Sequence, residues 1–497
     1  MPIQLSQLIQ NYPCTVHGTT DPMITTLEYD SRRTTVDGCM FFCMPGAKLD
    51  GHSFAQIVYE NGCRVFVVEH LVDLPDDAVQ VVVPASRAAL AALSAEFYGN
   101  PAEQLTLIGI SGTKGKTTTS ILIKEILCAN GIECAYIGSN GISYQNKQFE
   151  TVNTTPESRE LHRHFRGMVD AGVTHVVMEV SSQSLCTHRV DGLHFDTVIY
   201  TNLGRDHISE GEHATFEEYR DAKRRLYHDF GAKHIVYNAD DDHATYMIDG
   251  VTDAELLSYA IRKDADFRGS DLRSYRDETS LGIDFDVLHD GLRTSVRLRT
   301  PGAFSIYNGL AAIATCACYG VTVRRSADTL RKTSITGRFE IVDALPGITF
   351  IIDYAHNGLS LTDALSVLRT YDPKRLICVF GTVGGRTQER RKELAEASSA
   401  LADFSVITSD NPNFEDPDAI IEEILEHFDK NAPYTTITDR EEAVRFAVRI
   451  AEEGDIVLFA GKGHETYQLI EGKKVPFSER ALIVDEAAKV REKSFVL

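Results

Sequence analysis

Short apolar runs alternate with amphipathic stretches along the whole chain. The stretches Arg87–Tyr98 and Thr119–Ala129 have the spacing of apolar residues that is typical of helices burying one face. Short runs that are apolar throughout are typical of strands covered on both faces. We expect such strands at Leu105–Ile110, Val176–Val180, Thr197–Tyr200, Ile235–Tyr237, Phe350–Ile352, Leu376–Phe380 and Ile456–Ala460. The alternation predicts an α/β protein with parallel sheets and crossover helices.

The length of 497 residues corresponds to roughly three domains of ordinary size. One break is expected near Gly99–Glu103, where a helical stretch ends at Gly-Asn-Pro, and a second around Ser334–Gly337. We therefore expect a small N-terminal α/β domain over 1–101 and a central P-loop ATPase-like domain with a parallel or mixed sheet over 102–335. A C-terminal Rossmann-like domain is expected over 336–497.

The charge of the chain excludes some partners. There are 50 Lys and Arg residues against 72 Asp and Glu residues, a net charge of −22. Such a surface repels nucleic-acid backbones and anionic membranes, so neither is expected as a partner. No apolar run approaches the length of a membrane span and no export signal is visible at the start, so we expect a cytoplasmic protein.

A glycine-rich stretch lies between the strand expected at Leu105–Ile110 and the helix that follows it. Strand, glycine loop and helix are the context of a nucleotide phosphate site. Gly112 and Gly115 allow backbone N–H groups to surround the phosphates, Lys116 reaches the terminal phosphates, and Thr117 can hold Mg²⁺. The predicted ATP-binding residues of the loop are Gly112, Thr113, Lys114, Gly115, Lys116, Thr117 and Thr118. The standard spacing would put a glycine at Ile110, so a chance glycine turn is the alternative, and the Asn-Lys-x-Asp element of a GTPase is not found.

Three further residues are candidates for metal or catalytic roles. Glu179 lies at the end of an apolar strand, where a carboxylate near a phosphate loop is well placed for Mg²⁺. His207 and Lys223 follow in the sequence. Taken singly, the histidine is more often a packed or solvated residue and the lysine an ordinary helix residue, so their order along the chain matters more than each one alone.

In that order, after the glycine loop, the motifs resemble those of the Mur ligases, which use ATP to add amino acids to the cell-wall precursor UDP-N-acetylmuramate. The resemblance runs along essentially the whole chain, and its details are similar to the tripeptide synthetases of this family. The motifs are YDSR (29–32), DGH (50–52), NTTP (153–156), MEVSS (178–182), HRV (188–190), TNLGRDH (201–207), GRFE (337–340), DYAH (353–356), DNP (410–412) and AGKGHETYQ (460–468).

The resemblance implies the chemistry. Such enzymes activate the carboxylate of the growing peptide as an acyl phosphate with ATP, and the incoming amine attacks it. It implies Lys116, Lys223, His207 and Glu179 as catalytic residues, and Thr117, Glu179, His207 and Lys223 as ligands or supports of two Mg²⁺ ions, with Lys223 carbamylated. It also implies Arg338 at the ATP phosphates, Asn308 at the adenine and Asp353 at the ribose.

The resemblance further implies where the UDP-sugar peptide binds. Ser31 matches a residue near the uridine diphosphate, in an N-terminal domain that binds the UDP-sugar. Thr154, Thr155, Ser181 and Arg189 match residues that hold the muramoyl dipeptide, and an arginine suits its carboxylates. The chain departs from many relatives at Gln183, Ser184 and Thr187.

The incoming amino acid is predicted from the last domain, at Asp410, Asn411, Pro412, Asn413 and Glu465. Enzymes for meso-diaminopimelate carry an arginine after DNP, which binds the distal carboxylate of that substrate. Here the position is Asn413, so we expect L-lysine, with Asp410 and Glu465 facing its distal ammonium. Ornithine and meso-diaminopimelate remain alternatives.

Two other functions remain open. Folylpolyglutamate synthetase also makes an amide through an acyl phosphate, but it lacks a leading uridine-nucleotide domain. A catalytically silent nucleotide-binding module would not need Lys116, Glu179, His207 and Lys223 together. We expect an active monomeric ligase that uses ATP and Mg²⁺.

Overall fold

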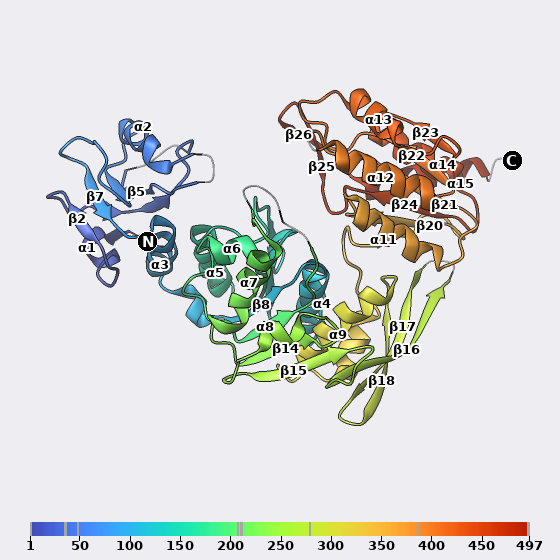
Figure 1. Ribbon diagram of the computed structural model, residues 1–497, viewed down its shortest axis with the longest axis horizontal. Coiled ribbons are helices and arrows are strands. Elements are labelled where there is room, and N and C mark those ends of the chain that lie inside the picture. Colours follow the sequence, from blue (N-terminus) through green and yellow to red (C-terminus); the bar gives the residue numbers. More distant parts are fainter. Residues whose placement is uncertain are drawn as a thin grey trace. The chain divides into compact units, whose positions relative to one another are not determined.

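The computed structural model describes residues 2–33, 37–46, 49–205, 208, 212–277, 280–385 and 387–494. It divides into two compact units, one made of Met1–Arg268 with Leu310–Thr322 and the other of Gly269–Gly309 with Val323–Leu497. Sheets with helices packed on them occur in both units, which confirms the α/β class (Figure 1). Among the described residues, no helix is both long and apolar enough to cross a bilayer.

The first unit begins with a small mixed sheet. Its strands, in spatial order, are β2 (Thr15–His17), β7 (Val79–Val82), β6 (Val65–Val68), β5 (Cys39–Phe42) and β4 (Thr26–Glu28). The helices of this part are α1 (Leu5–Leu8), α2 (Ala55–Glu60) and α3 (Ser86–Phe97), and the short strands β1 (Ile3–Gln4) and β3 (Met23–Ile24) pair beside it. Strands β5 and β6 are buried at every position, as expected for strands covered on both faces.

A larger sheet follows in the same unit. Its order is β11 (Lys147–Phe149), β10 (Gly141–Tyr144), β9 (Cys134–Gly138), β12 (His175–Glu179), β8 (Thr106–Ser111), β13 (Thr197–Tyr200), β14 (His234–Asn238), β15 (Glu255–Ala260) and the start of β16 (Phe267–Arg276). The pairs from β9 to β15 are parallel, so their carboxyl ends meet at one edge. Its helices are α4 (Lys116–Ala129), α5 (Ser158–Asp170), α6 (Ser182–Cys186), α7 (Phe216–His228), α8 (Ala244–Ile248) and the end of α9 (Ala303–Ala317).

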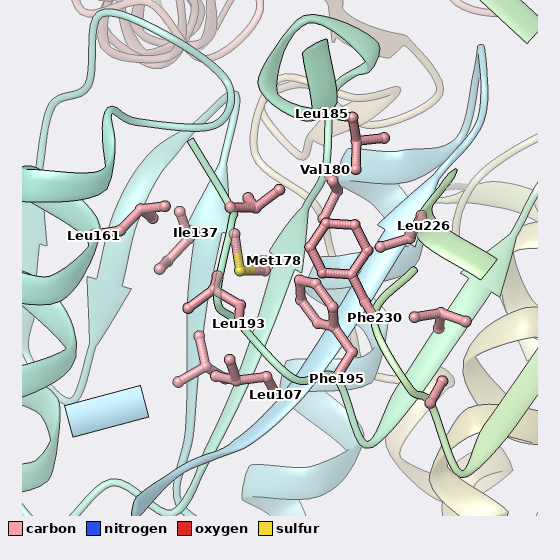
Figure 2. Close-up of a cluster of buried hydrophobic side chains, with 14 of the residues drawn as sticks. Leu107, Ile137, Leu161, Met178, Val180, Leu185, Leu193, Phe195, Leu226 and Phe230 are labelled. Carbon is pink, nitrogen blue, oxygen red and sulfur yellow. The ribbon is translucent and has the colours of Figure 1, made fainter. Parts of the chain in front are cut away.

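The core on one face of this sheet fixes the carboxyl edge. Leu107, Ile137 and Met178 lie in the same buried cluster, on three neighbouring strands (Figure 2). The rings of Phe195 and Phe230 join it edge to face, with centroids 5.8 Å apart. Each fully buried apolar side chain of this size contributes roughly 2 kcal/mol relative to exposure, so the strand ends are held by a rigid layer.

The second unit contains a sheet with the order β19 (Glu340–Val342), β20 (Thr349–Asp353), β24 (Ile456–Ala460), β21 (Leu376–Phe380), β22 (Phe404–Ile407) and β23 (Tyr434–Thr436). From β20 to β23 the pairs are parallel. The hairpins β17 (Leu281–His289) with β18 (Leu292–Leu298) and β25 (Tyr467–Ile470) with β26 (Lys473–Pro476) are antiparallel.

Alternate residues of the second sheet face two helical layers. Leu376 and Cys378 lie in a core with α11 (Gly358–Arg369), α12 (Gln388–Leu401) and α13 (Pro417–Glu426). Ile377 and Val379 lie in a separate core with α14 (Arg440–Ile450) and α15 (Glu479–Ser494). Helix α10 (Val323–Leu330) precedes this part of the chain. The period of two along β21 thus produces a sheet covered on both faces, as a Rossmann-like domain requires.

Candidate active site

The glycine loop lies between β8 and α4, as the sequence predicts. Gly112 has a φ of +148°, and a Cβ there would lie 1.9 Å from Thr201 Oγ1, so a side chain cannot be accommodated. Gly115 has a φ of +87° immediately before Lys116, the first residue of α4. Lys116 Nζ donates to the carbonyl oxygens of Gly112 (2.8 Å) and Thr113 (3.0 Å). The lysine therefore closes the loop at the N-terminus of a helix, where anions bind favourably.

The segment after β13 holds the loop in place. Thr201 Oγ1 donates to the Lys114 carbonyl (2.8 Å), and Asn202 Oδ1 accepts from Lys114 N (2.9 Å). Asn202 O accepts from Thr113 N (2.9 Å). Sequence reasoning noted this segment as a motif but gave Thr201 and Asn202 no role, because their partners are far away in the sequence.

Helix α7 brings Lys223 to the same loop. Its side chain is buried, and Nζ donates to the Gly112 carbonyl (3.0 Å) and lies 4.7 Å from the centre of the Tyr219 ring. The Tyr219 hydroxyl is 3.0 Å from Thr113 Oγ1. The structure therefore brings Lys116 and Lys223 together. His207 lies outside the described residues.

Glu179 is fully buried at the end of β12. Its Oε1 accepts from the Tyr136 hydroxyl (2.7 Å) and Ser139 N (3.1 Å), and Oε2 accepts from Ser139 Oγ (3.3 Å). A Cβ at Gly138 would lie 2.2 Å from Oε1, so this glycine makes room for the carboxylate. Tyr136 and Ser139 were missed from the sequence, since only the pairing of β9 with β12 shows that they are neighbours.

The residues present fit a magnesium ion by their chemistry. Glu179 supplies a carboxylate at the end of β12, and Thr117 supplies a hydroxyl in the first turn of α4, which follows the neighbouring strand β8. Oxygen donors of these kinds are those that Mg²⁺ prefers. Within the described ranges, no group of three or more His, Cys, Asp or Glu side chains is placed so that it could hold a metal ion.

The predicted dipeptide-binding residues lie beside Glu179. Thr155 Oγ1 donates to the Glu179 carbonyl (2.9 Å) and accepts from Ser181 N (3.0 Å). Arg189 donates to the Thr155 carbonyl (3.1 Å). Its guanidinium also pairs with Glu157 at 3.0 Å, so the arginine is already partnered.

Thr154 and Ser31 complete the predicted set. The hydroxyl oxygens of Thr154 and Ser139 are 3.1 Å apart, which places Thr154 in the same hydrogen-bonded group as Glu179. Ser31 lies in the turn after β4 and takes no part in these hydrogen bonds.

In the second unit, Asp353 is buried at the end of β20. Its two oxygens accept from Phe339 N (2.8 Å) and Ala355 N (2.9 Å). Burial raises the pKa of Asp353, although the nearby Arg338 acts to lower it. The Arg338 guanidinium lies over the Tyr354 ring, 4.8 Å from its centre. Asn308 is buried in α9.

The predicted amino-acid residues Asp410, Asn411 and Glu465 meet around a buried lysine. Lys462 Nζ donates to Asn411 Oδ1 (2.7 Å) and Glu465 Oε2 (2.6 Å), and it lies 3.5 Å from Asp410 Oδ1. Asn411 Nδ2 also donates to Glu465 Oε2 (2.9 Å). Sequence reasoning missed Lys462, although it lies inside the AGKGHETYQ motif, because a lysine between glycines gives no local sign of burial.

Asn413 forms hydrogen bonds with the backbone of the β25–β26 hairpin. It has a φ of +55°, and its Oδ1 accepts from Gly472 N (2.9 Å) in the β25–β26 turn. Its backbone N–H donates to the Leu469 carbonyl (2.9 Å). The preceding Pro412 packs so closely on Gly384 that a Cβ there would lie 2.0 Å from the proline carbonyl oxygen. The DNP segment is thus fastened to the hairpin.

Comparison with known proteins agrees with this geometry. The chain matches the Mur ligase middle domain over residues 110–316 and the Mur ligase glutamate ligase domain over residues 337–463. A relative from Geobacillus thermodenitrificans, UDP-N-acetylmuramoyl-L-alanyl-D-glutamate–2,6-diaminopimelate ligase, is 39% identical over 476 residues, covering 94% of this chain and 95% of the relative.

Solved structures show the same fold. A UDP-N-acetylmuramoyl-L-alanyl-D-glutamate–2,6-diaminopimelate ligase superposes with a TM-score of 0.68 at 27% identity, covering 99% of this chain and all of the other. The MurF ligase of Thermotoga maritima, solved with ADP, has a TM-score of 0.59 at 18% identity and covers 95% of this chain and 97% of the other. The chain belongs to the Mur ligase family, the ATP- and Mg²⁺-dependent ligases of peptidoglycan precursor synthesis.

Proposed function

We propose that the chain adds L-lysine to UDP-N-acetylmuramoyl-L-alanyl-D-glutamate, releasing ADP and phosphate, as a cytoplasmic monomer. The choice of lysine rests on the charges around the DNP segment (410–412). Asp410 and Glu465 provide carboxylates, whereas position 413 holds an uncharged amide whose oxygen is bonded to the β25–β26 turn. A distal ammonium suits these carboxylates, and the distal carboxylate of diaminopimelate would lack an arginine at position 413.

In the first step, the phosphate loop binds the ATP phosphates. The Lys116 ammonium, now on the Gly112 and Thr113 carbonyls, exchanges these partners for phosphate oxygens. Thr117 and Glu179 hold Mg²⁺, which supplies Lewis-acid stabilisation of phosphate charge. We assign His207 and a carbamylated Lys223 to support of a second ion. Asn308, Asp353 and Arg338 contact the nucleotide.

The acceptor substrate is held by groups near Glu179. Thr154, Thr155, Ser181 and Arg189 bind the dipeptide, and Ser31 binds the uridine diphosphate. The terminal carboxylate oxygen of the bound dipeptide attacks the γ-phosphorus of ATP and ADP leaves, which gives an acyl phosphate. The α-amine of lysine then attacks the acyl carbon, the carbon–oxygen bond to phosphate breaks, and the amine proton passes to solvent.

We also propose that three domains divide the binding of the substrates. Residues 1–101 bind the UDP-sugar, residues 102–335 bind ATP, and residues 336–497 bind the amino acid.

One competing substrate has specific support. The Geobacillus relative is named for 2,6-diaminopimelate, so meso-diaminopimelate is the second candidate, and L-ornithine presents the same charges as lysine on a shorter stem.

The test is phosphate release by the purified protein with ATP, Mg²⁺ and UDP-N-acetylmuramoyl-L-Ala-D-Glu, with each amine in turn and product mass as the check. Tripeptide formation with L-lysine in preference to meso-diaminopimelate is expected. A preference for meso-diaminopimelate would contradict the lysine assignment and leave the ligase class intact.

A further inference from the structure

The amino-acid site contains its own cation. The Lys462 side chain is fully buried, and all of its close polar contacts named above are to Asp410, Asn411 and Glu465. Burying a lysine costs several kcal/mol unless it is paired, so its place between two carboxylates stabilises both the lysine and the acidic pair. The sequence motif alone does not assign this residue to the site.

A second buried pair behind the site cancels its own charge. Arg440 and Glu479 are both buried, and the guanidinium donates to Glu479 Oε1 at 3.0 and 2.6 Å. Arg440 also donates to the carbonyls of Ser409 (3.1 Å) and Ala460 (2.9 Å), the residues directly before Asp410 and Gly461. This pair therefore fixes the backbone on both sides of the site and adds no net charge to it.

Asp410 retains an acceptor that is not used. Its Oδ1 is buried, reaches Lys462 only at 3.5 Å and makes no hydrogen bond within the part of the chain that the structure describes. A Cβ at Gly461 would lie 2.8 Å from Asp410 Oδ2, so the glycine leaves room at this carboxylate. Burial raises the pKa of Asp410, whereas Arg440 and Lys462 act to lower it. A buried acceptor without a donor favours a ligand that brings one.

We propose that Lys462 is a positioning and specificity-determining residue that compensates one of the two carboxylates and leaves the site a single negative charge. This inference rests on the proposed function, because it concerns the amine that the ligase joins. An amino acid whose distal end carries one ammonium matches a single negative charge. The distal end of meso-diaminopimelate carries both an ammonium and a carboxylate and is neutral overall, so it does not match a site with a single negative charge.

The charge balance can be tested with four proteins: wild type, Lys462→Met, Glu465→Gln and the double variant. The measurement is kcat/KM for L-lysine and for L-norleucine, which has the same four-carbon side chain without the distal ammonium, at neutral pH. Wild type should favour lysine. In Glu465→Gln the charges of Asp410 and Lys462 cancel, so the preference for lysine over norleucine should fall about tenfold or more. In Lys462→Met, the two uncompensated carboxylates share a proton at neutral pH and together keep one negative charge, so the preference for lysine should persist there and should increase as the pH is raised and the second carboxylate ionises, a pH dependence that wild type should not show.

The double variant again has one negative charge, so its preference for lysine should exceed that of Glu465→Gln. KM for ATP should change less than twofold in all variants. Lys374→Met is the matched control, because Lys374 is exposed, pairs with Glu452 at 2.7 Å and precedes β21 at the opposite edge of the sheet. It should behave as wild type.

The outcomes distinguish the inference about Lys462 from the proposed function. If wild type joins lysine but the double variant prefers it no more than Glu465→Gln does, Lys462 is merely structural and the inference is wrong while the proposed function stands. If wild type prefers meso-diaminopimelate or joins no amine, both are wrong. Should Lys462→Met fail to fold, Glu465→Gln decides alone, since an unchanged preference for lysine would overturn the charge count.

Discussion

Lys116 and Lys223 donate to the same acceptor, the carbonyl oxygen of Gly112, at 2.8 and 3.0 Å. One begins the helix after the loop and the other comes from α7, more than a hundred residues later. Two ammonium groups on one carbonyl repel each other, and carbamylation of Lys223 would relieve that repulsion, because it replaces one of the two positive charges by a negative one. Lys116 would then be the member of the pair that keeps a positive charge at the loop, where the terminal phosphates of ATP are expected.

Replacement of Lys116 should abolish the reaction. Lys116→Met removes the ammonium that stabilises charge on the transferred phosphoryl group, and we expect a loss of about a thousandfold in kcat. The measurement is phosphate release with the UDP-linked dipeptide and L-lysine. Lys124→Met is the control, because Lys124 lies two turns further along α4 and donates to Ser143 Oγ at 3.3 Å. Turnover near the wild-type rate in Lys116→Met would contradict the assignment of the phosphate loop.

Lys223→Ala should also be nearly inactive, but for a different reason. If Lys223 acts as a carbamate, a small carboxylic acid can occupy the space left by the side chain and restore part of the activity. We expect partial recovery with acetate or formate in Lys223→Ala and none in Lys116→Met. Lys233→Ala, at an exposed lysine paired with Asp196 at 2.6 Å, should be fully active. Absence of rescue together with wild-type activity would remove Lys223 from the mechanism.

Tyr136→Phe should weaken the dependence on Mg²⁺. The Tyr136 hydroxyl donates to Glu179 Oε1 at 2.7 Å, and loss of a group that orients a metal ligand typically costs about tenfold or more in metal affinity or activity. The measurement is the Mg²⁺ concentration that gives half-maximal rate. Tyr144→Phe is the matched control, because Tyr144 is a buried tyrosine of β10 that stacks on Phe149. Equal Mg²⁺ dependence in the two variants would argue against Glu179 as a ligand.

The buried histidines of α5 should make the protein sensitive to mild acid. Burial lowers the pKa of His162 and of His164 to about 4 in each case. The unfolded chain, with an ordinary pKa of about 6.5, takes up protons between these values and the folded chain does not. The free energy of unfolding therefore falls as the pH drops from about 6.5 to 4, by about 3 kcal/mol for His162 and by less for His164, which is less deeply buried.

The check is the midpoint of thermal unfolding at pH 7.5 and pH 5. His162→Gln keeps a polar side chain that does not titrate, so its midpoint should drop less than that of wild type. His17→Gln, at an exposed histidine of β2, should drop as wild type does. An identical drop in all three proteins would show that other groups govern the acid sensitivity.

Local sequence patterns were sufficient to predict several strands, a helix and the glycine loop. The strands expected at Thr197–Tyr200, Leu376–Phe380 and Ile456–Ala460 have these bounds in the structure. Helix α4 begins at Lys116 rather than at the expected Thr119. The reason is that Gly115 adopts a left-handed conformation and ends the loop there, so the threonines belong to the first helical turn.

The sequence by itself determined the α/β class, the phosphate loop and the family, because apolar periodicity, glycine positions and ordered motifs are properties of neighbouring residues. Only the tertiary structure decided that Tyr136 orients Glu179 and that Lys462 lies buried between Asp410 and Glu465. Those relations depend on which strands pair and which side chains lose contact with water. Burial and charge pairing arise when distant segments pack, and no local pattern of residues records them.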